Sequence, residues 1–108
     1  MNILFVCSAN IDRSRTAEAI FTARYREHRF KSAGTNQDIC QECSSTVVSK
    51  EHLDWAEHIF VMEEKHLKYL HELDPFLDAE RVTVLDIPDG FKYLSANLIA
   101  ILDEKVHF

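Results

Sequence analysis

The sequence predicts an α/β protein in which a parallel sheet is covered by helices on both faces. Short apolar runs rich in strand-forming residues, such as residues 3–6 and 58–62, alternate along the chain with longer stretches of helical periodicity. Strands that alternate with helices pair in parallel, because each helix returns the chain to the edge where the next strand begins. The first run is apolar almost throughout, as expected of a strand that is buried on both faces.

Four strands and four helices are expected, in alternation. The strands are predicted at residues 2–7, 29–33, 58–62 and 81–85. The helices are predicted at residues 14–27, 45–56, 63–73 and 94–105. Pro75 ends the third helix because proline cannot continue one, and the polar region 35–45 is predicted to be a loop. The 108 residues contain no repeat or linker, so we expect one domain over residues 1–108.

The composition of the chain argues against several classes of function. The net charge is −6 and lysine and arginine form no long block, so nucleic acid is not an expected partner. No apolar run approaches the roughly 18–20 residues that span a bilayer, and no membrane association is expected. The first residues lack the basic region of a signal peptide. Three cysteines in a chain without an export signal favour a cytoplasmic location, where thiols stay reduced.

The stretch from Val6 to Ser14 is typical of a phosphate-binding loop. Five residues separate Cys7, at the end of the first predicted strand, from Arg13, and a helix follows. Five residues can direct their main-chain N–H groups at one tetrahedral anion, and the N-terminus of the helix points its positive dipole into the same space. The guanidinium of Arg13 can hold two phosphate oxygens at once. The expected phosphate-binding residues are Ser8, Ala9, Asn10, Ile11, Asp12, Arg13 and Ser14.

Cys7 is the predicted nucleophile. A cysteine on a buried strand is by default an inert core residue. The arginine and the helix start beside Cys7 favour its ionised form instead, and a thiolate beneath a bound phosphate is placed to attack phosphorus. The pattern Cys-(five residues)-Arg-Ser is typical of cysteine-dependent phosphatases.

The chain resembles the low-molecular-weight protein tyrosine phosphatase family. The resemblance rests on the N-terminal place of the loop and on the following residues: Asn10, Ile11, Arg13-Ser14, Ala17-Glu18-Ala19, residues 32–35 and residues 55–62. It implies a three-layer, flavodoxin-like fold with four parallel strands in the order 2-1-3-4. It also implies hydrolysis of phosphotyrosine-type monoesters, with no metal and no organic cofactor. The chain is shorter than is usual for the family.

Three loop residues carry separate expectations. The loop has no glycine, so Asn10 is expected to adopt the positive φ that shapes it. Ser14 can cap the helix, and the resemblance implies that its hydroxyl also bonds the sulfur of Cys7. Asp12 stands where many members of the family have a second cysteine. A carboxylate there would weaken anion binding unless it points away, to solvent or to a lysine.

The reaction also needs a general acid, because the leaving oxygen must collect a proton. The family uses an aspartate that is usually followed by proline and an aromatic residue, a pattern that occurs literally at residues 74–76. That aspartate precedes the fourth strand and should lie at the edge of the sheet opposite Cys7. Asp86 and Asp89 follow the strand, and the resemblance favours Asp89, with Gly90 in place of proline. Both aspartates can also be ordinary turn residues.

Cys40 and Cys43 form one CxxC pair in the predicted loop. A single pair does not supply the four ligands of a structural zinc site, and the six histidines are scattered, so no metal site is expected. We expect both residues to be solvated loop cysteines. The alternative is a redox role, as the resolving thiols of an arsenate reductase, a class of enzyme that resembles the same family.

Three functions are compatible with the sequence. The leading hypothesis is a cytoplasmic phosphatase in which Cys7 attacks phosphorus, Arg13 and the loop N–H groups hold the oxygens, and Asp89 or Asp86 protonates the leaving group. The alternatives are an arsenate reductase and a non-catalytic phosphate-binding regulatory module. The expected substrate is a phosphorylated protein or a small phosphomonoester, with phosphotyrosine and phosphoarginine both open, and the expected state is a monomer or a weak dimer. Phe91 and Tyr93 are candidates for the wall of a phosphotyrosine pocket, or for core or surface positions.

Overall fold

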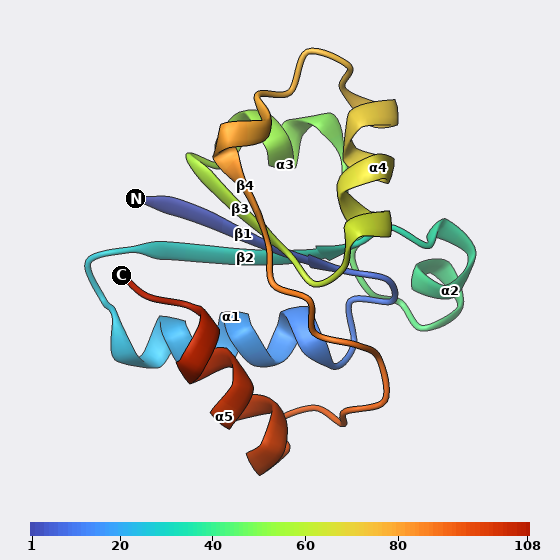
Figure 1. The fold of residues 1–108 in the computed structure, drawn as a ribbon. Coiled ribbons are helices and arrows are strands. Elements are labelled where there is room, and N and C mark those ends of the chain that lie inside the picture. The colour runs from blue at the N-terminus through green and yellow to red at the C-terminus, as the bar shows by residue number, and fades with distance from the viewer.

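The computed structural model describes all 108 residues and has four parallel strands at its centre (Figure 1). The strand order is β2-β1-β3-β4, and every pair of neighbours is parallel. The strands are β1 (Asn2–Cys7), β2 (Arg29–Gly34), β3 (His58–Val61) and β4 (Val82–Val84). The fold class and the strand order predicted from the sequence are therefore confirmed.

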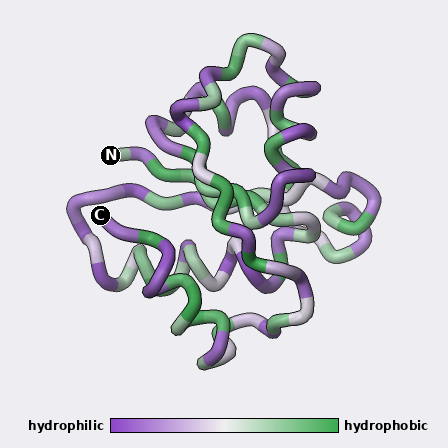
Figure 2. Tube along the Cα trace, viewed as in Figure 1, coloured by the Kyte–Doolittle hydropathy of each residue, from purple (hydrophilic) through white to green (hydrophobic).

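Helices cover both faces of the sheet (Figure 1). One face packs against α1 (Arg13–Arg24) and α5 (Ala96–Lys105), and the other against α3 (Lys50–Trp55) and α4 (Glu64–Leu73). Side chains of β1 alternate between these two cores, because successive residues of a strand point to opposite faces. Ile3 and Phe5 join the first core, and Leu4 and Val6 join the second. Figure 2 shows the resulting band of hydrophobic residues along the central strands.

The region between β2 and α3 differs from the prediction. Residues 35–45 are not a loop throughout, because they contain the short helix α2 (Gln37–Glu42), which Asn36 caps by accepting a hydrogen bond from the N–H of Ile39. The predicted helix over 45–56 begins only at Lys50. The preceding segment runs alongside the end of β2 instead, where Gly34 donates its N–H to Thr46 and accepts that of Val48. Edge pairing with β2 satisfies these groups and outweighs helix formation.

The other boundaries differ by a few residues. Helix α1 ends at Arg24 rather than residue 27, and β4 contains only three residues after the 3₁₀ turn Ala79–Arg81. Helix α5 begins at Ala96 because Ser95 caps it, and Leu94, which the predicted helix included, is exposed with a φ of 58°. None of the helices is both long enough and apolar enough to cross a bilayer.

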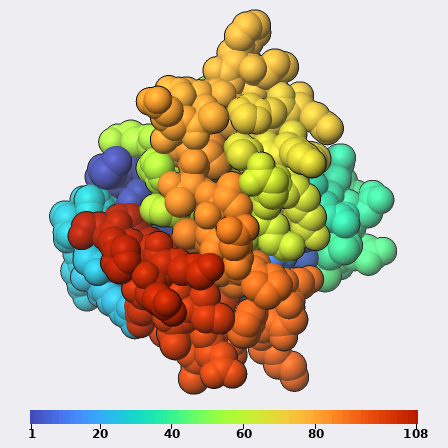
Figure 3. All heavy atoms as spheres, in the orientation of Figure 1, coloured from blue at the N-terminus to red at the C-terminus, as the bar shows by residue number.

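The parallel sheet brings three connections to one edge. Because all strands run the same way, the ends of β1, β3 and β4 lie side by side. The residues that follow them are the segment after Cys7, the Met62–Glu63 pair and the segment after Leu85. In Figure 3 the last of these is seen in orange, running over the front of the molecule beside α5. Ligands of open parallel sheets bind at this edge.

Candidate active site

The loop between β1 and α1 is held in one shape by Asn10. This residue has a φ of 53°, the positive value that the absence of glycine predicted, and it is buried. Its side-chain oxygen accepts the N–H of Thr46 at 3.1 Å, which fixes the orientation of the amide. The two amide protons go to Ser14 Oγ at 2.9 Å and to Ser32 Oγ at 2.8 Å, and Ser32 in turn donates to Glu18 at 2.5 Å. Every polar group of the Asn10 side chain thus has a partner.

The sulfur of Cys7 receives two hydrogen bonds from this loop. Ser14 Oγ lies 3.0 Å from Cys7 Sγ, and the N–H of Asn10 donates to the same sulfur at 3.2 Å. Because Ser14 Oγ already accepts from Asn10, its own proton is free to point at the sulfur. Both bonds stabilise a thiolate. Ser14 is buried in the first turn of α1 and does not cap it; the N-cap is Asp12.

Arg13 is buried beneath the same edge of the sheet, with 2% of its surface exposed. Its Nη1 donates to Glu63 Oε2 at 2.6 Å and to the carbonyl of Ile87 at 2.7 Å. Its Nε and Nη2 have no hydrogen-bond partner in the chain. One nitrogen therefore anchors the guanidinium, and two remain for the oxygens of an anion.

Glu63 and His66, which the sequence analysis did not select, support the loop from α4. The hydrogen bond from Arg13 holds the pKa of Glu63 below its usual value, so this carboxylate stays ionised. His66 is fully buried and accepts the N–H of Glu63 at its Nδ1, which leaves the proton on Nε2, 2.9 Å from Ser8 Oγ. Burial and the nearby Arg13 lower the pKa of His66 to about 4. Glu63 directly follows the predicted strand 58–62, and this place at the edge where ligands bind was the signal that could have identified it.

Of the two aspartates expected to supply the acid, Asp89 lies nearer the anion site. Asp89 Oδ1 is 3.9 Å from Arg13 Nε, and its side chain is 75% exposed. Asp86 is exposed, has a φ of 54° and forms no ion pair with Arg13. Gly90 has a φ of 112°, which proline cannot adopt, so the departure from the family pattern has a conformational reason. Asp74 ends α4, before β4, as predicted.

The carboxylate of Asp12 is engaged by another part of the chain and is not free to face the anion site. Its Oδ1 accepts the N–H of Tyr93 at 2.9 Å, and Thr16, one turn later, accepts the N–H of Leu94 through its hydroxyl. The partner is a backbone N–H rather than the solvent or lysine that was expected. These two bonds fasten the segment that carries Asp89 to the start of α1.

Cys40 is not the solvated loop cysteine that the sequence predicted. It lies in α2, is fully buried, and directs its thiol at the carbonyl oxygens of Ser8 and Ala9, 3.8 and 3.5 Å away. Cys43 is exposed, as expected. Helix α2 thus packs Cys40 against the back of the phosphate loop.

The strand–loop–helix unit that carries Cys7 and Arg13 lies within a segment that matches a known protein family. Residues 2–56 match the family model described as low molecular weight phosphotyrosine protein phosphatase. The chain belongs to this family. This phosphatase is therefore an enzyme that acts on phosphorylated substrates, as the sequence predicted. No curated protein sequence matches it.

Solved phosphatase structures share the fold of this phosphatase over nearly its whole length. The YwlE arginine phosphatase from Geobacillus stearothermophilus is 27% identical, with a TM-score of 0.71, over 95% of this chain and 84% of that one. Wzb from Vibrio vulnificus, solved in complex with benzylphosphonate, is 20% identical, with a TM-score of 0.77, over 96% and 92%. The tyrosine phosphatase AmsI from Erwinia amylovora is 18% identical, with a TM-score of 0.72, over 96% and 87%. The last two likenesses concern the fold alone.

Proposed function

We propose that this phosphatase hydrolyses phosphotyrosine-type monoesters through a phosphorylated Cys7. The observation that supports the proposal most is the pair of hydrogen bonds aimed at Cys7 Sγ, from Ser14 Oγ and from the N–H of Asn10. Donors that stabilise a thiolate favour both its attack on phosphorus and its later departure. A buried structural cysteine needs neither.

In the first step, Cys7 Sγ forms a bond to phosphorus and the bond from phosphorus to the ester oxygen breaks. The free Nε and Nη2 of Arg13 and the N–H groups of the loop hold the phosphate oxygens, on which charge accumulates. Asp89 gives its proton to the leaving oxygen. The 3.9 Å between Asp89 Oδ1 and Arg13 Nε supports this role, because it places the carboxyl group at the rim of the anion site.

In the second step, water attacks the phosphorus of the phosphorylated Cys7. Asp89, now a carboxylate, takes a proton from this water, and the Cys7 thiolate departs with the electrons of the S–P bond. Inorganic phosphate is released, and Ser14 and Asn10 again stabilise the thiolate. Glu63 keeps Arg13 oriented through both steps.

The aromatic substrate class is supported by the surroundings of the loop. Ile11 is half-buried in the loop, and its side chain is entirely apolar. Tyr93 is partly exposed, its N–H is bonded to Asp12 of the loop, and its ring lies 5.7 Å from the guanidinium carbon of Arg15. An apolar side chain in the loop and an aromatic residue on the adjoining segment suit a phenyl ring better than the polar guanidinium of phosphoarginine. Phe91 packs against the core instead and is assigned no contact with substrate.

Turnover of an aryl phosphate by two cysteine variants tests the reaction. We expect Cys7→Ser to abolish hydrolysis of para-nitrophenyl phosphate, while Cys43→Ser, at an exposed cysteine, keeps the wild-type rate. A wild-type rate no higher than that of Cys7→Ser would contradict the proposal and favour a module that only binds phosphate. An arsenate reductase would stall after one turnover when Cys40 and Cys43 are both serine, whereas the phosphatase should continue.

The substrate class is tested with matched peptides. A phosphotyrosine peptide should have a kcat/KM at least about tenfold above that of the same peptide with phosphoarginine, since one apolar contact contributes roughly 1–3 kcal/mol. The reverse ratio would assign the enzyme to phosphoarginine.

A further inference from the structure

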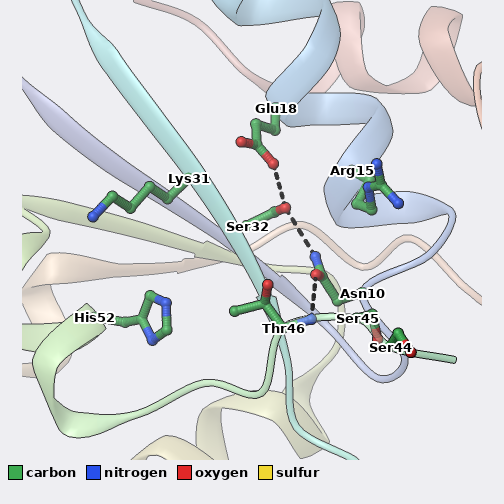
Figure 4. Close-up of a pocket in the computed structure, with 9 residues that line it drawn as sticks. All are labelled: Asn10, Arg15, Glu18, Lys31, Ser32, Ser44, Ser45, Thr46 and His52. Atoms are coloured by element: carbon green, nitrogen blue, oxygen red, sulfur yellow. Dashed lines mark hydrogen bonds between the residues drawn. The ribbon is translucent and has the colours of Figure 1, made fainter. Parts of the chain in front are cut away.

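A cavity lies next to the phosphate loop, and none of Cys7, Arg13 and Asp89 lines it (Figure 4). Its volume is about 480 Å³. The walls come from α1, β2, α3 and the 44–46 segment, and the side chain of Asn10 reaches it from the loop. The cavity is therefore distinct from the anion site, although the two share one residue.

All the residues that line this cavity are polar or charged. Three hydroxyl side chains, Ser44, Ser45 and Thr46, lie along one side (Figure 4). An apolar ligand would gain no contact surface there, whereas the hydroxyl groups of a small polyol could exchange hydrogen bonds with this wall.

Two of the lining residues are cations without an acidic partner. Arg15 and Lys31 form no ion pair; their close neighbours are the rings of Tyr93, at 5.7 Å, and Trp55, at 4.5 Å. Figure 4 shows them on opposite sides of the cavity. The one carboxylate of the lining, Glu18, is already engaged by the hydroxyl of Ser32. Two cations against this one carboxylate leave the lining with a net charge of +1, which favours an anion.

His52 adds a neutral donor to the same wall. Its Nδ1 accepts the N–H of Ser49 at 3.0 Å, so its proton is on Nε2, which has no partner in the chain. Burial and the nearby Lys31 lower the pKa of His52, so the ring is neutral at physiological pH. The cavity thus combines two cations, an unpaired N–H and several hydroxyls.

The floor of the cavity is connected to the nucleophile. Asn10 and Ser32, joined by a hydrogen bond that Figure 4 draws, both line the cavity, and Asn10 also donates to Ser14, which bonds Cys7 Sγ. A ligand on this floor would contact the groups that keep the loop in shape. The hydrogen bonds that Asn10 makes to both sites provide a physical connection through which a ligand in the cavity can act on the loop.

We propose that this cavity binds a small hydroxylated oxyanion, a sugar acid or a sugar phosphate, and that the bound ligand changes kcat at the phosphate loop. Carboxylate and phosphate share the chemistry that Arg15 and Lys31 recognise. The binding part of the proposal stands independently, and the effect on kcat rests on the phosphatase function proposed above.

Binding is tested by NMR titration of the ¹⁵N-labelled wild-type protein with its anion site filled by orthovanadate. The probes are gluconate, glucose 6-phosphate and neutral glucose. We expect saturable shifts of the Asn10 side-chain amide and of the Thr46 N–H with one or both anions, and at least about tenfold weaker binding of glucose, because charge-assisted hydrogen bonds are lost. Comparison of gluconate with glucose 6-phosphate identifies the preferred anion.

Variants at exposed positions locate the site. Arg15→Gln and Lys31→Gln should each weaken binding about tenfold or more, and Lys50→Gln, an exposed lysine outside the cavity, should leave it unchanged. Absence of saturable shifts, equal binding of glucose, or binding that neither cavity variant affects would overturn the proposal.

The effect on the reaction is measured as nitrophenolate release from saturating para-nitrophenyl phosphate, with each anion that binds in the titration. An anion that only competes for the phosphate loop raises KM and leaves kcat unchanged. A change in kcat that disappears in Lys31→Gln supports the coupling, and a kcat that no saturating anion changes overturns it. Because the titration needs no turnover, failure of the phosphatase function and failure of the cavity proposal are distinguishable.

Discussion

The phosphate loop and the segment over residues 86–94 supply the two halves of the reaction, and they are built very differently. The loop is anchored by buried residues: Asn10, Arg13 and Ser14 are each almost fully covered, and each is fixed by at least one buried hydrogen bond. The 86–94 segment is buried at Ile87, but most of its other residues are exposed, and it carries Asp89 with 75% of its side chain exposed. It is fastened to the loop and to α1 by the bonds from Arg13 to Ile87, from Tyr93 to Asp12 and from Leu94 to Thr16.

This difference follows from the tasks of the two regions. An anion is held best by donors that are already oriented, since no energy is then spent on rearrangement. The acid must meet leaving groups of different shapes and let the product depart, so a surface segment suits it. Changes in the packing of the loop should therefore reduce activity. In the acid segment, activity should fall when Asp89 itself is replaced or when the hydrogen bonds that hold the segment are removed.

The largest effect is expected at the acid. Asp89→Asn should lower kcat by about 10²–10⁴-fold, the usual contribution of a general acid, whereas Asp86→Asn should change it little. The loss should shrink with an aryl phosphate whose leaving group needs no proton. Steady-state kinetics with a series of aryl phosphates provide the measurement. If Asp86→Asn is the damaging variant, the assignment of the two residues is reversed.

Two glycine variants compare the regions directly. A Cβ on Gly34 would lie 2.6 Å from both Ser8 O and Cys40 Sγ, so Gly34→Ala should distort the loop, remove most of the activity and cost about 1–3 kcal/mol of stability. A Cβ on Gly90 meets nothing within 4 Å, and Gly90→Ala should add only about 1–2 kcal/mol of backbone strain, on the exposed segment. Activity and urea unfolding of both variants should separate them. Equal loss of activity would show that the acid segment is as rigid as the loop.

The pH dependence of stability tests whether buried, neutral His66 stabilises the fold around the loop. The unfolded chain takes up a proton on this residue near pH 6.5, but the folded protein resists until about pH 4. Stability contributed by neutral His66 is therefore complete above pH 6.5 and is lost as the pH falls, by about 2–3 kcal/mol between pH 7 and pH 4.5. In His66→Gln, which can still cap α4, urea unfolding at the two pH values should show a smaller difference. If the difference in stability between the two pH values is the same in His66→Gln as in the wild type, His66 does not cause the pH dependence.

The smallest effect is expected at the fastening of the acid segment. Asp12→Ala removes one hydrogen bond, about 1 kcal/mol, and should lower kcat about fivefold. Inhibition by vanadate should stay the same or become stronger, because the variant takes a negative charge away from the anion site. Asp103→Ala, which removes an exposed partner of Arg24 on α5, is the control. Weaker vanadate inhibition in Asp12→Ala would instead place Asp12 among the groups that shape the loop.

Local sequence patterns predicted the alternating α/β class and the shape of the loop, whereas the strand order was predicted from the family resemblance. The strand at 2–7 is a buried apolar run, and the positive φ of Asn10 followed from the absence of glycine in a loop that must bend around an anion. The parallel sheet was enough to predict the edge on which each aspartate lies. Asp74 precedes the fourth strand and was placed away from Cys7, whereas Asp86 and Asp89 follow that strand and were placed beside it. The roles of Cys7, Arg13 and Asp89 in catalysis remain predictions.

The missed features depend on contacts between distant parts of the chain. Glu63 meets Arg13 across fifty positions, and His66 meets Ser8 across fifty-eight, so neither pairing leaves a local pattern. The helix over 37–42 was assigned to a loop because it is short and polar, and its burial of Cys40 against the carbonyls of the phosphate loop is a tertiary effect. The bond from Tyr93 to Asp12 uses a backbone donor, which no residue type reveals.

The central claim is that the phosphoryl group of the substrate, held by the preorganised loop, is transferred to Cys7 itself. Rapid acid quench of the enzyme during turnover of para-nitrophenyl phosphate, followed by mass spectrometry of its peptides, tests this directly. The account predicts one phosphoryl group on the peptide that contains Cys7, more of it at high substrate, and none in Cys7→Ala. Sustained turnover in Cys7→Ala, or a phosphoryl group only on another residue, would contradict it.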